Sequence, residues 1–555
     1  MSSNELCFDS LQLLIVSDVD DGAICSTFGY YLLGDGGGGR YLISHDMGSI
    51  PEIAYKCSNG LYAILLHNGS ITLEQLGAIG ELEGETAFKD SWAAFYKAYQ
   101  IKKNHQFTTN IEFILSKNAY YCSKPILICT GMVLRTAGTS WICKIIYGGD
   151  TVSKNEVSDT QGVYATDESV VYSSIKAQVI FVNEDSSYCY YSSLIGVQFR
   201  NGSDVTGDVL YGIYAPYCGK VVIENVRCDG VSIGLYGRDI WGSLIKGSTF
   251  IGINTSLEPA SGTVGVKIEP YLGVDAYELG GTSNVYQCVG VSGFQIGFKI
   301  TRQEYSTFES CYSEKGNDVV MEFHGCDGIS ITGFGIENLI NTLYAAVRFY
   351  NTRASIDSLT FAYNCKISGG SVVWANNRSI ICIQSISFGR VINTGSFITL
   401  FLVNTNGVID VRTYDIPDSL KLSPGYAFAS IESSGRFISD HVFTSGLGVA
   451  NGTSNNNAVD FSINDLKYKM NGNSISLQYS ASWSGGEGTD FQVFGFPRLF
   501  SCDGFFNAIL LSTGRTVIAR WLKGTNRVKL FSAIDGVSIS IPESGTLIIQ
   551  GEYFV

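Results

Sequence analysis

The stretch TFESCYSE at residues 307–314 belongs to a set of eight-residue segments that repeat one pattern along the middle of the chain. Successive segments begin 22, 41, 22, 23 and 25 residues apart. Recurrence of this kind is typical of repeat architectures, in which each turn stacks on the next and none is stable alone. The segments are VIENVRCD (222–229), LIKGSTFI (244–251), VYQCVGVS (285–292), TFESCYSE (307–314), SITGFGIE (330–337) and SIDSLTFA (355–362).

The register of the repeat predicts two inward-facing ladders of side chains. A further strand follows the segments, as in GFQIGFKI (293–300) and DVVMEFHG (318–325). We therefore predict an all-β fold built around a right-handed parallel β-helix, because a leucine-rich repeat would need a Leu-x-x-Leu-x-Leu pattern that is absent. The second positions hold Ile223, Ile245, Tyr286, Phe308, Ile331 and Ile356, and the seventh hold Cys228, Phe250, Val291, Ser313, Ile336 and Phe361.

Composition supports this fold class and excludes several functions. The chain of 555 residues is 45% hydrophobic and 16% charged, with 63 glycines and 9 prolines, which favours an ordered protein of short strands and glycine turns. A net charge of −14 argues against nucleic acid as a partner. No apolar run approaches the roughly 20 residues that span a bilayer, and the start lacks a secretory signal. We therefore expect no membrane insertion, and synthesis in a cytoplasm.

The fifteen cysteines form no Cys-x-x-Cys pair and have no histidine at metal-ligand spacing. This pattern predicts neither a zinc site nor a disulfide framework, and we expect no metal or other cofactor. Most of the cysteines are expected to be buried thiols that pack as small hydrophobic side chains.

Changes in character along the chain predict three parts. Residues 1–70 combine short strands with glycine turns and are expected to form a small head. Residues 71–440 are expected to form the β-helix, with an amphipathic helix near 84–103 covering its open first turn. Residues 441–555 alternate as antiparallel strands and are expected to form a β-sandwich.

The chain resembles a known family, the bacteriophage tailspikes with a pectate-lyase-like β-helix. The resemblance rests on GYYLLGDGGGGRYLI (29–43), on ITLEQLGAIGELEGETAF (71–88) and on the order of head, helix, β-helix and sandwich. In that family, the sequence before the helix usually has Phe, Lys and paired aspartates at the positions of Leu76, Ile79 and Gly84-Glu85 in this chain. The glycine run is expected to be a tight strand connection, because no Gly-Lys-Ser/Thr opens a helix as a phosphate loop requires.

The resemblance implies a virion tail protein that acts outside the cell at the bacterial surface. It implies a homotrimer whose head attaches to another phage tail or adaptor protein. It also implies that this trimer binds and depolymerises a bacterial capsular polysaccharide. The family shares no single catalytic signature, so the resemblance assigns no catalytic residues.

The repeat register itself brings two carboxylates together. Glu314 and Glu337 occupy the eighth position of consecutive segments. Strands about 4.8 Å apart place such a pair near the roughly 5–5.5 Å of a retaining glycosidase, while splayed side chains reach the separation of an inverting enzyme. We predict this pair as the acid and the base or nucleophile of a hydrolase, with Glu309 and Asp318 as the next candidates.

A second set predicts lyase chemistry instead. Aligning the strands that follow the segments places Lys299, His324 and Arg348 in consecutive turns. Such a cluster could neutralise a uronate carboxylate and abstract its C5 proton, with Tyr305 as the acid. A surface histidine is more often a bystander, and a lysine here could simply pair with Glu322.

Aromatic side chains near these turns are candidates for sugar stacking, because sugar rings have apolar faces. Hydrolase, lyase, a glycan-binding spike without enzymatic activity and a purely structural tail protein remain as hypotheses. The aromatic candidates are Trp241, Tyr271, Tyr277, Tyr312 and Trp374.

Overall fold

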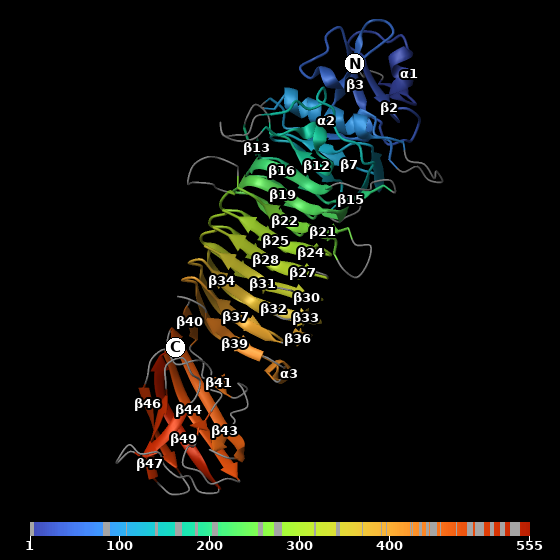
Figure 1. The fold of residues 1–555 in the computed structure, drawn as a ribbon. Helices are drawn as coiled ribbons and strands as arrows, with labels where there is room; N and C mark the ends of the chain where they lie inside the picture. Colours follow the sequence, from blue (N-terminus) through green and yellow to red (C-terminus); the bar gives the residue numbers. More distant parts are fainter. Residues whose placement is uncertain are drawn as a thin grey trace. The chain divides into compact units, whose positions relative to one another are not determined.

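The structure is a computed structural model of the whole chain (Figure 1). It consists of two compact units, residues 1–340 and 341–555. The residues that it describes are 5–80, 89–106, 108–138, 143–160, 169–183, 187–202, 209–253, 259–270, 280–315, 318–339, 345–368, 370–389, 391–395, 397–421, 423, 426–431, 436–439, 443–444, 452–454, 457–472, 474–484, 492–493, 504–510, 515–521, 528–532 and 544–554.

The first unit begins with a small sheet in the strand order β1-β2-β3-β5-β4. Its elements are β1 (Leu6–Phe8), α1 (Leu11–Val16), β2 (Ile24–Thr27), β3 (Arg40–Ser44), η1 (Pro51–Ile53), β4 (Ala54–Lys56) and β5 (Tyr62–Leu66).

The glycine run of this head is a turn organised by one carboxylate. Asp35 accepts hydrogen bonds from the backbone N–H groups of Tyr30, Tyr31, Leu32 and Gly37. Burial opposes ionisation of Asp35, but these backbone donors outweigh it and hold its pKa below the ordinary value. A Cβ at Gly37 would lie 2.5 Å from a backbone oxygen, so the close approach of the chain there requires glycine.

One amphipathic helix, α2 (Trp92–Asn104), packs against β9 (Ile126–Ile128). β9 is the end strand of its sheet, so the helix covers an edge, as expected. The predicted start near residue 84 is wrong by several residues, because Asp90 forms a β-bridge with Tyr121. The carboxylate of Asp90 then accepts from the backbone N–H of Trp92, where the helix begins; residues 84–88 lie outside the described residues.

The rest of the first unit is a parallel β-helix with three sheets (Figure 1). Sheet 1 contains β9, β12 (Ala177–Phe181), β16 (Tyr211–Gly219), β19 (Ile233–Trp241), β22 (Val264–Ile268), β25 (Ile296–Thr301) and β28 (Val319–His324), and the short β13 (Cys189–Tyr190) pairs with β16.

Sheets 2 and 3 are made of short parallel strands. Sheet 2 contains β6 (Ser70–Thr72), β7 (Glu112–Leu115), β10 (Val133–Thr136), β14 (Ser193–Ile195), β17 (Val222–Glu224), β20 (Leu244–Lys246), β23 (Val285–Gln287), β26 (Thr307–Glu309) and β29 (Ile329–Thr332). Sheet 3 contains β8 (Ala119–Cys122), β11 (Cys143–Tyr147), β15 (Val197–Asn201), β18 (Arg227–Val231), β21 (Thr249–Gly252), β24 (Gly290–Ser292), β27 (Tyr312–Glu314) and β30 (Phe334–Glu337). The 3-10 turns are η2 (Glu74–Leu76) and η3 (Tyr172–Ser174).

The inward ladders form the core of this unit, in the predicted register. Tyr286 lies opposite Phe308, and Phe308 lies opposite Ile331. The rings of Tyr286 and Phe308 stack with centroids 4.6 Å apart and both are fully buried. Full burial of an aromatic or aliphatic side chain contributes about 1.5–3 kcal/mol, so stacked ladders of this kind hold successive turns together.

The second unit also contains parallel strands. One ladder joins β31 (Ala345–Tyr350), β34 (Ser371–Asn376), β37 (Ile398–Val403) and β39 (Tyr426–Ile431), and another joins β32 (Arg353–Tyr363), β35 (Ile380–Ser387), β38 (Val408–Asp415) and β40 (Arg436–Ser439). Shorter elements are β33 (Cys365–Ile367), β36 (Val391–Asn393) and α3 (Asp418–Lys421).

The end of the chain is antiparallel, as its alternating pattern predicts. Its pairings close into a circuit, β43-β44-β49-β46-β47-β48-β45-β42-β43. The strands are β41 (Phe443–Thr444), β42 (Gly452–Ser454), β43 (Asn457–Gly472), β44 (Ser474–Ser484), β45 (Gln492–Val493), β46 (Gly504–Leu510), β47 (Arg515–Trp521), β48 (Val528–Ser532) and β49 (Ser544–Phe554).

Candidate functional site

Two glutamates on sheet 3 lie at equivalent positions of neighbouring turns. Glu314 ends β27 and Glu337 ends β30, and the two residues are direct partners in the parallel ladder. The side chain of Glu314 is 33% exposed, and the Lys315 ammonium lies 3.9 Å from its Oε1. Because residues of a strand alternate between faces, the buried Ser313 points inward and Glu314 outward. The predicted register of the two carboxylates is therefore confirmed.

The ring of Tyr312 lies beside this pair on the outer face of sheet 3. Tyr312 is two residues before Glu314 in β27 and is 37% exposed. A Cβ built at Gly290 on the preceding strand would be 2.1 Å from Cζ of Tyr312, so the ring lies across the glycine. An exposed ring next to paired carboxylates is an arrangement suited to an extended sugar chain.

The other two acidic candidates lie elsewhere in the same turn. Glu309 ends β26 on sheet 2 and accepts a hydrogen bond of 3.1 Å from the Gln287 amide. Asp318 immediately precedes β28 and accepts a hydrogen bond of 3.1 Å from the amide of Gln295. Glu309 is therefore on a different sheet from the Glu314 and Glu337 pair.

The lysine and histidine of the lyase set are not opposite one another. On sheet 1, Lys299 lies opposite Glu322 and Thr301 lies opposite His324. The sequence alignment of these strands is therefore wrong by two residues at β28. A slip of two residues keeps the same side chains on the outer face, so the hydrophobic pattern could not reveal it.

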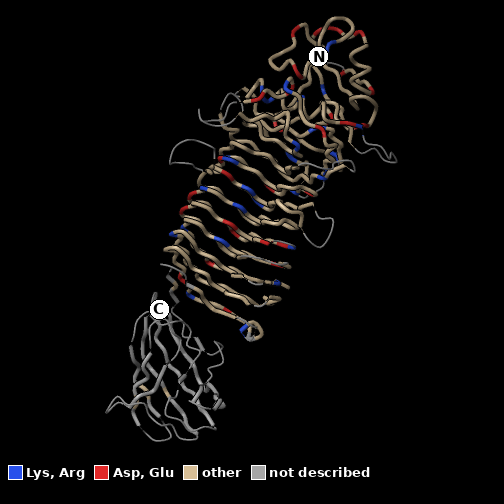
Figure 2. Tube along the Cα trace, viewed as in Figure 1, with Lys and Arg blue, Asp and Glu red and all other residues tan. Residues whose placement is uncertain are grey.

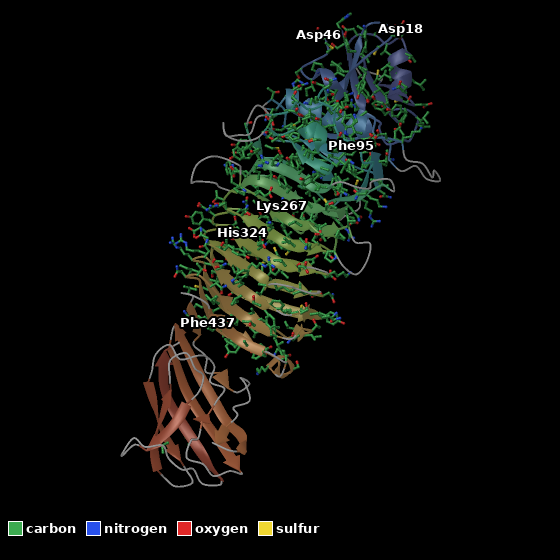
Figure 3. All side chains as sticks on the ribbon, in the orientation of Figure 1. Asp18, Asp46, Phe95, Lys267, His324 and Phe437 are labelled. Carbon is green, nitrogen blue, oxygen red and sulfur yellow. The ribbon has the colours of Figure 1, made fainter. Side chains whose placement is uncertain are left out.

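Glu322 nevertheless joins the two basic residues into one cluster. Its Oε1 is 3.0 Å from Nε2 of His324 and 3.6 Å from Nζ of Lys299. The side chain of Glu322 is 9% exposed, whereas those of Lys299 and His324 are 35% and 38% exposed. The side chains of Lys299 and His324 are thus partly exposed, whereas the carboxylate between them is buried. Figure 3 labels His324 on the β-helix.

A second charged cluster lies on the same sheet. Lys267 lies opposite both Tyr236 and Lys299 in the ladder, and its ammonium is 2.5 Å from Oε1 of Glu269 (Figure 3). Burial raises the pKa of Tyr236 to about 12, although Arg238 opposes the shift, so the phenol is protonated at neutral pH. Acidic and basic residues are interspersed along the turns of the β-helix (Figure 2).

Tyr305 and Arg348 are the other two candidates of the lyase set. Tyr305 follows β25 at a corner with φ of +49°, is 65% exposed, and its ring lies over Gly328. Arg348 lies on β31 of the second unit opposite Trp374, and its Nε donates to the carbonyl of Ala345.

Three of the five aromatic candidates, Trp241, Tyr312 and Trp374, are described, and two are not. Trp374 packs edge-on against Tyr350, with centroids 5.2 Å apart. Tyr271 and Tyr277 lie outside the described residues. Trp241 ends β19 and is part of a larger cluster with Tyr188, Tyr190 and Tyr191, which sequence reasoning missed. The signal was present as three tyrosines in the four residues YCYY (188–191).

Cysteines and helices add little to the site. Most cysteines in the described ranges are buried thiols, as expected. Those ranges hold no group of three or more His, Cys, Asp or Glu side chains arranged to bind a metal ion. They also hold no helix that is long and apolar enough to cross a membrane.

Comparison with known proteins identifies the class of fold. No protein-family model and no curated protein matches the sequence. Among solved structures, the chain has the parallel β-helix fold of phage tailspikes.

The gp42 tailspike of Acinetobacter phage vb_AbaP_AS12 is similar with a TM-score of 0.61 at 12% identity, over 97% of this chain and 95% of that chain. The tailspike protein of Acinetobacter phage vB_ApiP_P1 gives a TM-score of 0.42 at 11% identity over 100% of both chains. WceF of Pantoea stewartii, described as a glycan biofilm modifying enzyme, gives 0.39 at 11% identity, over 98% of this chain and 76% of that chain.

Proposed function

We propose that this chain is a phage tailspike that binds an extended bacterial surface polysaccharide along the β-helix and hydrolyses its glycosidic bonds. The observation that carries the proposal is the direct pairing of Glu314 with Glu337 on β27 and β30. Two outward carboxylates one strand apart, with the ring of Tyr312 beside them, supply both the acid and the base or nucleophile that such hydrolysis uses.

The two side chains and water supply every proton transfer that the hydrolysis needs. One carboxyl group protonates the oxygen of the leaving sugar as the glycosidic bond breaks. In one route the other carboxylate attacks the anomeric carbon, and water then hydrolyses this glycosyl ester while the first residue takes the proton of that water. In the other route the second carboxylate removes a proton from a water that attacks the anomeric carbon directly. Neighbouring strands are about 4.8 Å apart, which favours the short separation of a retaining enzyme.

The test is to assay Glu314→Gln and Glu337→Gln separately for new reducing ends on a panel of purified capsular polysaccharides. Each substitution should lower the rate by about 100-fold or more, because positioned acid–base groups typically contribute that much. Glu224→Gln is the matched control, since Glu224 also ends a short strand but pairs with Lys246 at 3.1 Å. Activity that survives in both variants would contradict the assignment.

Elimination on a uronic-acid polymer is the second candidate, favoured by the contacts of Lys299, Glu322 and His324. In that reaction a base takes the C5 proton of the uronate while the C4–O bond breaks and the leaving oxygen gains a proton. The products would then carry a C4–C5 double bond and absorb ultraviolet light, and Lys299→Met would abolish this signal. Products with no such absorbance support hydrolysis.

We also propose the assembly that a tailspike requires. The chain would form a homotrimer on a virion tail, with the head bound to another phage tail or adaptor protein, and would act outside the cell at the bacterial surface. If purified protein binds capsule and leaves its chain length unchanged, the spike is a receptor-binding protein without enzymatic activity. If it binds no glycan at all, its role is structural.

A further inference from the structure

An aromatic platform lies where the strands of sheet 1 end. Tyr190, Gly219 and Trp241 are direct partners on three successive strands. A Cβ at Gly219 would lie 2.7 Å from Cε1 of Tyr190 and 2.8 Å from Cε2 of Trp241. The glycine therefore leaves the space in which the two rings meet, with centroids 5.6 Å apart.

Packing against buried residues beneath the rings holds the platform in place. Tyr188 packs edge-on against both Trp241 and the fully buried Tyr217, with centroids about 6 Å apart in each pair. Its hydroxyl donates a hydrogen bond to the carboxylate of Asp239, which is 4% exposed. The rings are thus fixed before any ligand arrives, which lowers the entropic cost of binding.

The outer edge of the platform carries one lysine. Lys220 and Tyr191 both occupy left-handed corner positions, with φ of +54°. The Lys220 ammonium lies 5.3 Å from the ring centre of Tyr191 and 5.7 Å from that of Trp241, and it donates to the Tyr191 hydroxyl at 3.3 Å. Tyr191 is 62% exposed, and Lys220 is also an exposed residue.

The ammonium of Lys220 has no acidic partner among the described residues, in contrast to three other lysines of the first unit. Lys246, Lys267 and Lys299 each lie within 3.6 Å of a glutamate oxygen. Lys220 forms no ion pair with any carboxylate of the described residues, and its ammonium contacts two aromatic faces and a phenol there. A lysine in this setting retains its capacity to bind an anion through charge-assisted hydrogen bonds.

We infer that this platform, formed by Tyr188, Tyr190, Tyr191, Lys220 and Trp241, is a binding subsite for an acidic sugar. The apolar face of the sugar ring stacks on Trp241 or Tyr191, and its carboxylate accepts hydrogen bonds from Lys220. This inference rests on the proposed function and adds to it the class of polysaccharide, one that carries carboxylated residues. The chain's net charge of −14 does not prevent binding, because charges more than about 8 Å away are largely screened at physiological ionic strength.

The experiment is ligand-observed saturation-transfer NMR on the full chain, with sodium D-glucuronate and D-glucose as probes that differ in the carboxylate. We expect glucuronate to bind about tenfold more tightly than glucose, as a charge-assisted hydrogen bond implies. Lys220→Gln should remove this preference. Lys246→Gln is the matched control and should leave it unchanged, because Lys246 is already paired with Glu224.

Tyr191→Asn provides an independent check, since asparagine tolerates a positive φ and the corner should still fold. It should weaken binding of both probes by several-fold. Equal binding of the two probes, no detectable binding of either, or a preference retained in Lys220→Gln would overturn the inference. No bond is cleaved in this measurement, so failure of the proposed hydrolysis and failure of this subsite are observed separately.

Discussion

The hydroxyl of Tyr120 donates a hydrogen bond to the carboxylate of Glu74 in the interior of the first unit. Tyr120 lies on β8 and is fully buried, and Glu74 lies in η2 and is 1% exposed. The bond joins the segment that precedes α2 to the first turns of the β-helix. Burial raises the pKa of Tyr120, and the neighbouring Glu74 raises it further, so the phenol keeps its proton at neutral pH.

Tyr120→Phe should therefore destabilise the first unit. The substitution keeps the ring but removes the donor from a buried carboxylate, which costs about 2–3 kcal/mol. Urea unfolding of the full chain measures the change. Tyr305→Phe serves as the control, because that side chain is 65% exposed and its hydroxyl is free to bond with water. Equal stabilities of the two variants would show that the bond contributes nothing.

Removing one ring from the inward ladder should have a larger effect. Phe308 is fully buried and contacts the rings of Tyr286, Phe298 and Phe323, with centroids 4.6, 6.0 and 5.4 Å away. Phe308→Ala should cost about 3–5 kcal/mol, because the stacked turns cannot close the cavity that it leaves. Calorimetry on this variant and on Phe308→Leu, which fills more of the space, should show a graded fall in Tm; a change in Tm no larger for Ala than for Leu would contradict the prediction.

Lys97 in α2 should make the free energy of unfolding depend on pH. Burial lowers the pKa of Lys97 to about 8, although the charge of Glu52 opposes the shift, and Nζ donates to the hydroxyl of Tyr55 at 3.1 Å. A lysine in the unfolded chain titrates near pH 10.4. Burial of the charged Lys97 therefore lowers the free energy of unfolding below pH 8, and the free energy of unfolding rises again as the pH increases from about 8 to 10.4.

Lys97→Met should accordingly stabilise the chain at pH 7 by about 1–3 kcal/mol, after allowing for the lost contacts with Tyr55 and Glu52. The gain should shrink as the pH rises and disappear near pH 10.4. Unfolding measured for both proteins at pH 7, 9 and 10.4 tests the trend. A difference between the two proteins that does not vary with pH would mean that Lys97 is solvated in the folded state.

The chain's own pattern determined a large part of the fold and one part of the site. Ile223, Ile245, Tyr286, Phe308 and Ile331 are consecutive partners, as their shared place in the repeat predicts. The same register placed Glu337 opposite Glu314. The repeat is legible in the sequence because each turn must bury the same positions against the turn before it.

Only the tertiary structure decided which side chains meet across sheet 1 and at the corners. Glu322, and not His324, lies opposite Lys299, because hydrophobic alternation determines the face of a strand but is unchanged by a slip of two residues. The platform around Lys220 depends on Gly219, since the space that brings Tyr190 and Trp241 together exists only once three strands are paired. A sequence pattern shows which residues of each strand are buried. Contacts between outward side chains depend instead on the register of strands that lie 22 or more residues apart in the chain.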